Sequence, residues 1–377
     1  MKRPETLLIV ADTERDANML YAVGMFVPDP FIYVRVRGRN FIVMSDLELD
    51  RARKQAIDCT VLSLGAYQRK LRRNGRQSSS LAEVAACLLK EKRANSVSVP
   101  TDFPLGLAQK LQSLKIKVKP HPGLFFAERE CKSPAEVRKI SAALMMAEVG
   151  MAEGIQALKA SKIGRDRRLM YRGAPLTSER LRAIIDTAIL QTCGLASHTI
   201  VAGGRQACDP HEIGHGPLRA DELIILDIFP RSQKTGYFGD ITRTVVRGRA
   251  SEAARQLYAT VLEAQSIAFR MMRPGTPTAK VHRTVQEFFV SQGYTTGRRG
   301  GRMQGFFHGT GHGLGLEIHE SPRIGLNSTA TLQAGHVVTV EPGLYYPAVG
   351  GVRLEDVALV TRNRPRNLTR FEKLLEI

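Results

Sequence analysis

Short apolar runs and helical patterns alternate over the first third of the chain. Four apolar runs have the length of buried strands: Leu7–Val10, Phe31–Val36, Phe41–Val43 and Thr60–Leu64. Two later segments repeat apolar residues at steps of three and four, as amphipathic helices do: Leu81–Lys92 and Leu105–Leu114. The alternation predicts a small α/β domain over residues 1–127. It holds no cluster of catalytic residue types, so we expect it to cover substrate or to form an oligomer contact.

A second domain is predicted over residues 128–377, and it opens on a helix signal. Ser133 can cap the helix, Pro134 suits the first turn, and Glu136 completes a capping box. A second helix is expected after Thr177, ending near Gly194. The helical patterns in this domain cover 133–158, 177–194, 251–272 and 278–292.

Two pairs of apolar strands follow the two pairs of helices. The first pair reads as a β-hairpin across a turn-rich linker, and the second pair lies near the C-terminus. The four predicted strands are Glu222–Ile228, Tyr237–Val246, His336–Glu341 and Val352–Val360. The two halves of this domain therefore share a plan of two helices followed by two strands, although their letters show no repeat.

Each strand pair carries two acidic residues, Asp227 and Asp240 in the first and Glu341 and Glu355 in the second. An ionised carboxylate is costly to bury in an apolar strand unless it is paired or bound to metal. One such acid alone could simply end a strand at the surface. Four of them on both sides of one glycine–histidine segment favour a metal site.

That segment, Phe306–Glu320, alternates glycines with His308, His312 and His319. Glycine lets the backbone pass close to a neighbour, and imidazole is the commonest metal ligand. Taken alone, the segment could be a surface turn. With the four acids it suits two divalent ions with bridging carboxylates. Oxygen ligands with a single histidine favour Mn²⁺, with Co²⁺, Fe²⁺ or Zn²⁺ as alternatives.

Two other motifs match known metal or nucleotide patterns less well. His211–His215 reads H-E-x-x-H, a zinc motif that works only on a helix. Pro210 before it, Gly214 inside it and Pro217 after it leave no room for a helix, so we expect an extended loop. The Gly309–Gly315 run resembles a dinucleotide loop but has no preceding strand and no later ribose acid.

The chain has 55 Lys and Arg against 36 Asp and Glu, a net charge of +19. The basic clusters are dispersed and carry no nucleic-acid module. We therefore expect solvated basic faces that bind polyanions only nonspecifically, although Arg298–Arg302 could line a substrate entrance. No run is long enough to span a bilayer, and the apolar run at residues 7–11 is too short for a signal peptide.

The five cysteines are scattered and form no CxxC pair, which favours free thiols in a reducing compartment. We expect a cytoplasmic protein.

Five stretches of the second domain resemble the pita-bread metallopeptidases, which include methionine aminopeptidase, Xaa-Pro aminopeptidase and Xaa-Pro dipeptidase. The matching stretches are Leu226–Ile228, Gly239–Thr244, Gly311–Gly315, Val340–Gly343 and Arg353–Asp356. The resemblance implies a pita-bread catalytic domain that binds two metal ions. The implied metal ligands are Asp227, Asp240, His312, Glu341 and Glu355, with Asp240 and Glu355 bridging the ions.

The resemblance favours the proline-specific branch, because His308 and Arg353 match residues of that branch and the N-terminal domain is present. It implies substrate contacts for His308 and Arg353, catalytic roles for His211 and His319, and a proton-transfer role for Glu341. Asp227 and Asp240 stand two positions farther apart than the family usually shows, which indicates extra residues near Lys234 in the hairpin tip.

The sequence therefore predicts a homodimeric peptidase that hydrolyses X-Pro bonds in peptides or dipeptides, either as an aminopeptidase or as a dipeptidase. The alternative is a catalytically silent binding protein that keeps the fold, with nucleic acid as a partner given the basic charge. Loss of a metal ligand would favour that alternative, and none of the five is missing.

Overall fold

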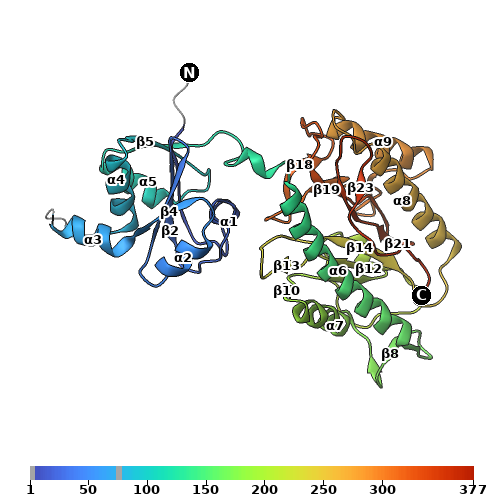
Figure 1. Cartoon of the computed structure of the whole chain (residues 1–377). Coiled ribbons are helices and arrows are strands. Elements are labelled where there is room, and N and C mark those ends of the chain that lie inside the picture. The colour runs from blue at the N-terminus through green and yellow to red at the C-terminus, as the bar shows by residue number, and fades with distance from the viewer. Residues whose placement is uncertain (1–4, 74–78) are drawn as a thin grey trace. The chain divides into compact units, whose positions relative to one another are not determined.

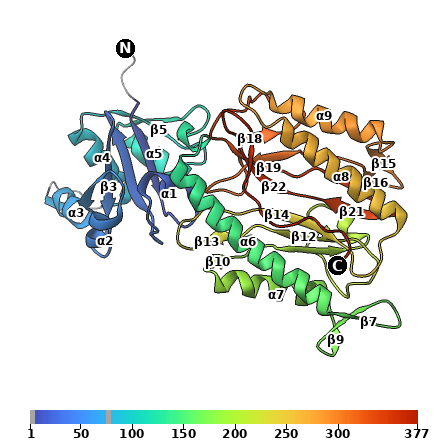
Figure 2. The same ribbon diagram turned by 45° about the vertical axis from the view of Figure 1, so that its right-hand side comes forward.

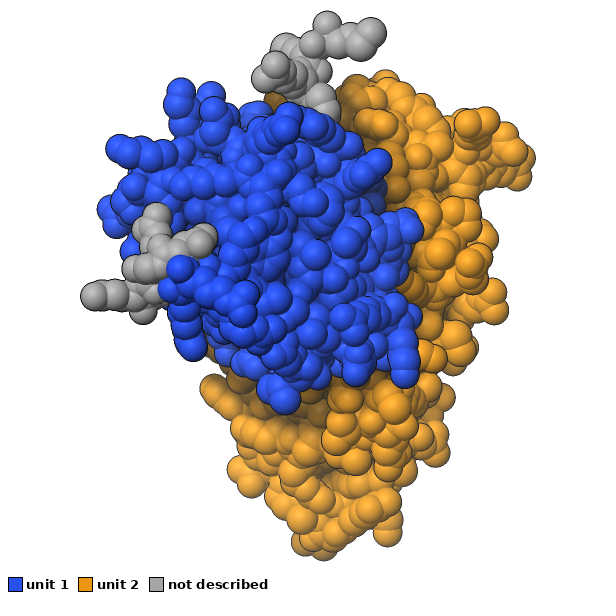
Figure 3. Space-filling view, turned by 60° about the vertical axis from the view of Figure 1, so that its left-hand side comes forward, with its two compact units in different colours: residues 1–129 blue, residues 130–377 orange. Residues whose placement is uncertain are grey.

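A computed structural model describes residues 5–73 and 79–377 and divides the chain into two compact units (Figure 1). Unit 1 comprises residues 1–129 and unit 2 residues 130–377, coloured separately in Figure 3. The border proposed from sequence lies between residues 127 and 128. Among the described helices, none combines the length and the apolar character that a membrane span requires.

Unit 1 is built on a six-stranded mixed sheet in the order β4-β3-β2-β1-β5-β6. Strands β1, β2 and β3 pair antiparallel, whereas β4, β5 and β6 join in parallel. The strands are β1 Leu7–Ala11, β2 Phe31–Val36, β3 Arg39–Met44, β4 Cys59–Ser63, β5 Ser96–Val99 and β6 Lys117–Pro120. The four strands predicted here are confirmed, and β5 and β6 are additional.

Side chains of alternate residues divide the core of unit 1 between the two faces of the sheet. Leu8 and Val10 of β1 pack with the face covered by α4 and α5, while Leu7 and Ile9 pack with α1 on the other. Both faces of the sheet are covered at β1, so this strand is apolar at every position. The helices are α1 Ala17–Val23, α2 Leu49–Gln55, α3 Leu64–Arg73, α4 Leu81–Glu91, α5 Leu105–Ser113 and the 3₁₀ helix η1 Ala127–Arg129.

Unit 2 contains two pairs of long helices, and the members of each pair lie side by side (Figure 2). They are α6 Pro134–Ala160, α7 Ser178–Gln191, α8 Glu252–Arg270 and α9 Thr278–Ser291. The predicted capping box of α6 is present, because Ser133 and Glu136 exchange hydrogen bonds between side chain and backbone. The residue with positive φ after α7 is Cys193, at 61°, and not the expected Gly194.

The first predicted strand pair is confirmed as an antiparallel ladder within the sheet β11-β12-β14. The strands are β11 Ile200–Gly203, β12 Ile224–Ile228 and β14 Ile241–Val245. Strand β14 begins four residues later than predicted. The connection from β12 to β14 contains β13 Arg231–Ser232, which pairs with β10 Gly194–Leu195. Lys234, near which the extra residues were predicted, lies in the turn that follows β13.

The prediction of one continuous strand from Val352 to Val360 is wrong. Its first residues belong to β21 (Gly350–Arg353), which pairs with β20 (Gly343–Tyr346), and its last to β22 (Asp356–Leu359). Strand β22 pairs antiparallel with β19 (Val337–Val340). The chain changes sheet at Leu354 and Glu355, and this bend brings Glu355 opposite Thr242 in an isolated bridge.

A five-stranded sheet, β18-β17-β19-β22-β23, carries the histidine segment. Its other strands are β17 Gly311–Gly313, β18 Glu320–Ile324 and β23 Arg366–Asn367. Helices α8 and α9 pack with it through an apolar core that includes Val261, Val285 and Val338. The remaining elements are β7 Lys162–Ile163, β8 Leu169–Tyr171, β9 Ala174–Pro175, β15 Gly297–Arg299, β16 Arg302–Gln304 and the 3₁₀ helix η2 Gln206–Cys208.

Candidate metal centre

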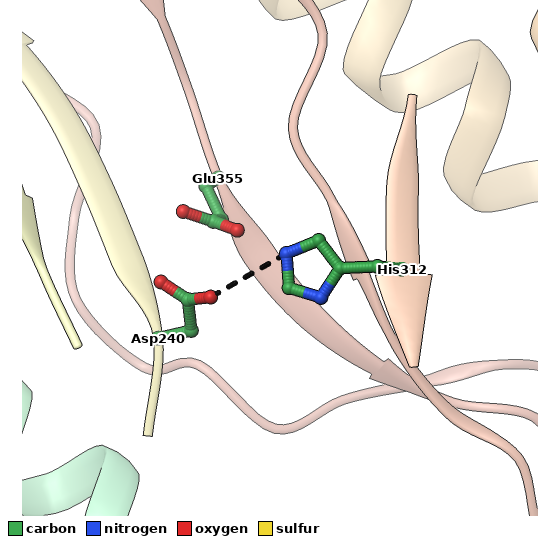
Figure 4. A group of neighbouring side chains, drawn as sticks. All are labelled: Asp240, His312 and Glu355. Atoms are coloured by element: carbon green, nitrogen blue, oxygen red, sulfur yellow. Dashed lines mark ion pairs between the residues drawn. The ribbon is translucent and has the colours of Figure 1, made fainter. Parts of the chain in front are cut away.

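Three of the predicted ligands gather into a group that has the dimensions of a metal site. Asp240, His312 and Glu355 each offer an atom within 4.8 Å of the others, and all three are buried (Figure 4). The His312 Nε2 lies 3.7 Å from the Asp240 Oδ2. Asp240 immediately precedes β14, His312 lies in β17, and Glu355 lies between β21 and β22.

The other two predicted ligands lie at the edge of this group. The Glu341 Oε1 is 3.5 Å from the His312 Nε2, at the end of β19. Asp227 lies in β12 and accepts a hydrogen bond from Arg353. All five side chains line one cavity of about 540 Å³.

The carboxyl groups strongly disfavour one another's ionisation. Burial, followed by the charges of Glu355, Asp227 and Glu341, raises the pKa of Asp240 well above its usual range. Burial and then Glu355 do the same to the pKa of Glu341. Burial and then Asp227 raise the pKa of Glu355 to about 7. A site that crowds acids in this way gains most from cations that neutralise them.

His312 presents a neutral imidazole to these acids. Burial, then the neighbouring His319, lowers the pKa of His312 to about 3. Its Nδ1 lies 3.1 Å from the Gly313 carbonyl oxygen, which can only accept, so Nδ1 carries the proton and donates. The lone pair of Nε2 is then free on the side of the carboxylates. Metal ions bind this neutral form, and such a backbone acceptor fixes the ring and its tautomer.

One buried oxygen completes the test of fit. The Glu355 Oε2 accepts a hydrogen bond from Thr242 at 2.7 Å, whereas its Oε1 is buried and has no hydrogen-bond partner among the described residues. A buried carboxylate oxygen without a partner is costly. Oxygen-rich donors with one imidazole are the set that hard or borderline divalent ions take. The residues present therefore fit a divalent metal site.

The glycines around His312 have a packing cause. A Cβ on Gly311 would lie 2.0 Å from the Thr339 carbonyl oxygen, and one on Gly313 would lie 2.1 Å from the Ser321 carbonyl oxygen. Neighbouring strands thus press on β17 from both sides. Glycine at these two positions lets His312 lie in the middle of the sheet.

Arg353 and His308 belong to a hydrogen-bonded chain that ends on a predicted ligand. Arg353 is only 3% exposed, and it donates to the Asp227 Oδ2 at 2.6 Å and to the Tyr345 hydroxyl at 2.9 Å. The Tyr345 hydroxyl lies 2.8 Å from the His308 Nε2, and the His308 Nδ1 lies 2.7 Å from the Gly309 carbonyl oxygen. Both ring nitrogens of His308 are therefore engaged within the protein.

His211 and His319 line the same cavity as the acids. The His319 ring stands edge-on to His312, with ring centroids 4.5 Å apart and planes at 86°. The H-E-x-x-H segment is not helical, as predicted, because Gly214 has a φ of +82° and packs on the Val201 carbonyl. His215 lies beside Gln206, so the two histidines of that motif do not form a common site.

Three residues of the site were not predicted from the sequence. Tyr345 and Thr242 hold Arg353 and Glu355 by hydrogen bonds, and Arg323 of β18 lines the cavity without an ion-pair partner among the described residues. Arg302 of the basic segment lines a second cavity of about 580 Å³, which shares Asp209, Pro210 and Phe307 with the first. Thr242 gives a weak sequence signal, because its partner Glu355 lies 113 positions away along the chain.

The fold and the donor set fit the class of proteins that bind divalent metal ions in a cavity lined by further histidines. The sequence model of metallopeptidase family M24 matches residues 138–362, and the chain belongs to this family. This confirms the resemblance to the pita-bread metallopeptidases and the predicted two-domain α/β organisation with an M24 catalytic domain.

Relatives that carry peptidase names match about half or more of the chain. A Xaa-Pro dipeptidase of Pyrococcus furiosus is 37% identical over 181 residues, which cover 48% of this chain and 49% of that protein. An uncharacterised peptidase of Bacillus subtilis, YqhT, is 32% identical over 248 residues, covering 61% of this chain and 67% of that protein. The alignment thus spans about half the length of the Pyrococcus relative.

Two solved structures share the fold over nearly the whole chain. A Xaa-Pro dipeptidase from Bacillus anthracis matches with a TM-score of 0.82 and 22% identity, covering 99% of this chain and 95% of that chain. An X-Pro aminopeptidase from Thermotoga maritima matches with a TM-score of 0.82 and 21% identity, covering 99% and 97%. At this identity the likeness establishes the fold.

Proposed function

We propose that the chain is a metal-dependent peptidase that hydrolyses X-Pro bonds at the N-terminus of short peptides. The observation that carries the proposal is one cavity lined by four crowded acids and a neutral imidazole, in which a buried Glu355 oxygen has no hydrogen-bond partner among residues 5–73 and 79–377. Membership of family M24 and the proline-specific relatives supply the substrate class.

Asp227, Asp240, His312, Glu341 and Glu355 would hold two divalent ions, with Asp240 and Glu355 shared between them. We propose Mn²⁺ as the preferred metal, because four of the five donors are carboxylates. When bound, such ions lower the pKa of water and polarise a carbonyl group.

The remaining steps fall to side chains of the cavity. Glu341 takes the proton of the attacking water and passes it to the departing nitrogen. His211 and His319 donate hydrogen bonds to the oxygen of the scissile carbonyl as charge develops on it. A donor of this kind contributes about 2.7–4 kcal/mol to transition-state stability in other enzymes.

The substrate contacts follow from which groups are already engaged. His308 offers its ring face and edge to an apolar proline ring, because both its nitrogens hold protein partners. Arg353 acts on substrate through Asp227, the residue that it pairs with. Arg323 is the cavity cation without an ion-pair partner among the described residues, and it suits the terminal carboxylate of a short peptide.

The test is an assay of metal-stripped protein on a matched set of peptides, X-Pro, X-Pro-Y and X-Ala-Y, with and without Mn²⁺. We expect metal-dependent cleavage confined to the proline peptides. Preference for X-Pro that Arg323→Gln removes would identify a dipeptidase, and preference for X-Pro-Y an aminopeptidase. Absence of cleavage under every metal would refute the proposal and revive the silent binding protein, whose retention on DNA or RNA would fall steeply with salt.

The setting of the enzyme is also proposed. The five cysteines are all free, which supports a reducing, cytoplasmic compartment. A homodimer is proposed, to be measured by light scattering of the purified chain. The net charge of +19 is assigned to nonspecific polyanion contacts only.

A further inference from the structure

A buried ion pair of unit 2 lies next to the candidate site without being part of it. The Lys132 Nζ lies 2.7 Å from the Glu320 Oε2, and the two side chains are only 1% and 5% exposed. Burying two charges costs about as much as their attraction returns, so such a pair contributes little net stability. The pair is therefore expected to matter for the residues that it holds in place.

The Glu320 carboxylate organises the loop that precedes it. Its Oε1 accepts hydrogen bonds from the backbone N–H groups of Leu316, at 2.9 Å, and Glu317, at 3.1 Å. A Cβ on Gly315 would lie 2.5 Å from the Glu320 Oε2. The loop between His312 and Glu320 thus wraps closely around this one carboxylate.

That loop carries His319, which lines the candidate site. The His319 ring contacts the His312 ring edge-on, yet its nitrogens make no hydrogen bond to any residue that the structure describes. No direct polar contact therefore fixes the ring. Its position depends on the loop backbone, and the loop backbone depends on Glu320.

Lys132 in turn is fixed at both of its ends. Its backbone N–H donates to the Gly335 carbonyl oxygen at 2.8 Å, just before β19. The next residue, Ser133, caps α6. The ammonium group therefore reaches Glu320 from a rigid point formed where α6 begins beside the start of β19.

From this geometry we propose that Lys132 is a positioning residue, which acts through the Glu320 carboxylate to hold His319 at the scissile carbonyl. The inference rests on the proposed peptidase function for the role of His319. It assigns to the pair a task in transition-state stabilisation and none in substrate affinity or metal binding.

The experiment is a set of double-mutant cycles on X-Pro hydrolysis by the metal-loaded full chain. Lys132→Met and Glu320→Gln are each made in the wild-type and the His319→Ala backgrounds. We expect Lys132→Met to lower kcat by about 10-fold to 100-fold with little change in KM or in bound metal. In the His319→Ala background the same substitution should cost less than about twofold, because the group that it positions is already gone.

A purely structural role would give a different pattern. Equal losses of kcat from Lys132→Met with and without His319, or an unchanged kcat, would overturn the inference. Glu320→Gln keeps an acceptor for the two loop N–H groups and serves if Lys132→Met does not fold. Lys110→Met, which breaks an ion pair with the buried Glu83 in unit 1, is the matched control and should leave kcat unchanged.

A second readout separates this inference from the proposed function. Ring resonances of His319 in the metal-free chain, assigned by their absence in His319→Ala, should shift in Lys132→Met and stay in place in Lys110→Met. Wild-type protein without peptidase activity would refute the proposed function alone. Unshifted His319 resonances in Lys132→Met would refute the positioning role whether or not the protein is active.

Discussion

The first half of unit 2, from α6 to β14, and the second half, from α8 to β22, each place two acids at one end of an antiparallel strand ladder. In the first half, Asp227 and Asp240 lie at one end of the β12/β14 ladder, and in the second, Glu341 and Glu355 lie at one end of the β19/β22 ladder. In each half, the strand ladder follows a pair of packed helices along the chain. The halves differ in their additional groups, because His312 and Arg353 both come from the second half.

The difference shows that each half donates a hydrogen bond to a predicted ligand of the other. Arg353 of the second half donates to Asp227 of the first, and Thr242 of the first half donates to Glu355 of the second. Arg243 of the first half also reaches Asp356 and the Glu355 carbonyl oxygen through its guanidinium. The candidate centre therefore forms only where the two halves meet, because each half supplies some of its side chains and neither supplies them all.

Removing one shared acid should have the largest effect. Asp240→Ala takes away a donor that the proposal shares between both ions, so peptidase activity should fall to the background of the assay. The metal-free variant should melt no lower than wild type, because a crowded, buried carboxyl group is gone. Asp50→Ala, at an exposed acid of unit 1, is the control. Full activity with metal present would show that Asp240 is not a ligand.

The second largest effect should come from breaking the contact between Arg353 and Asp227, which connects the two halves. Arg353→Met leaves Asp227 buried without its cation, which costs about 3–5 kcal/mol of unfolding free energy in other proteins. Urea unfolding of the metal-free chain measures it, and adding Asp227→Asn should recover most of the loss. Arg255→Met, which removes surface ion pairs with Glu252 and Glu376, should cost about 0–1 kcal/mol. Equal losses in the two arginine variants would contradict a special role for the contact between the two halves.

Acid should weaken the second half through His336, which is 1% exposed and precedes β19. Burial, then the Lys132 charge, lowers the pKa of His336 to about 4. Neutral His336 contributes fully to the free energy of unfolding above about pH 6.5. This contribution is lost as the pH falls towards 4, because the histidine of the unfolded chain takes up a proton at a higher pH than that of the folded chain. The full loss is about 3 kcal/mol.

The comparison is the slope of unfolding free energy against pH for wild type and His336→Asn. Asn can still accept the hydrogen bond that the Gln333 N–H donates to the His336 Nδ1. We expect a shallower slope between pH 6.5 and 4 in the variant. Identical slopes would mean that His336 does not contribute to the acid sensitivity.

A smaller effect should come from the strand that carries His312. Gly311→Ala places a methyl group against the Thr339 carbonyl and should cost about 1–3 kcal/mol. Gly325→Ala, where nothing lies within 4 Å, should change stability by no more than about 0.5 kcal/mol. Equal stabilities of the two variants would argue against close packing around β17.

Sequence patterns predicted the helices and strand ladders within each half well, but they predicted poorly the segment around Glu355, where the two halves meet. Apolar periodicity placed the four long helices and the β12/β14 ladder, because local burial generates both signals. It missed β20, which has only four residues between Pro342 and Pro347. It also ran β21 and β22 together, since the change of sheet at Glu355 has no local marker such as glycine or proline.

The site shows the same limit. The acids and His312 could be found because charged residues inside apolar strands are conspicuous. Thr242 and Tyr345 could not, because their importance comes from partners more than a hundred positions away in one case and from burial in the other. Arg353 was found by resemblance, but its contact with Asp227 needed the three-dimensional arrangement.

The most direct test of the account is the metal content of the purified chain after loading with Mn²⁺ and dialysis, measured by elemental analysis. The account predicts two ions per wild-type chain and a loss of both-ion loading in Asp240→Ala and in Glu355→Ala, one variant from each half. Wild-type protein without bound metal, or two ions retained in either variant, would contradict a centre shared between the halves.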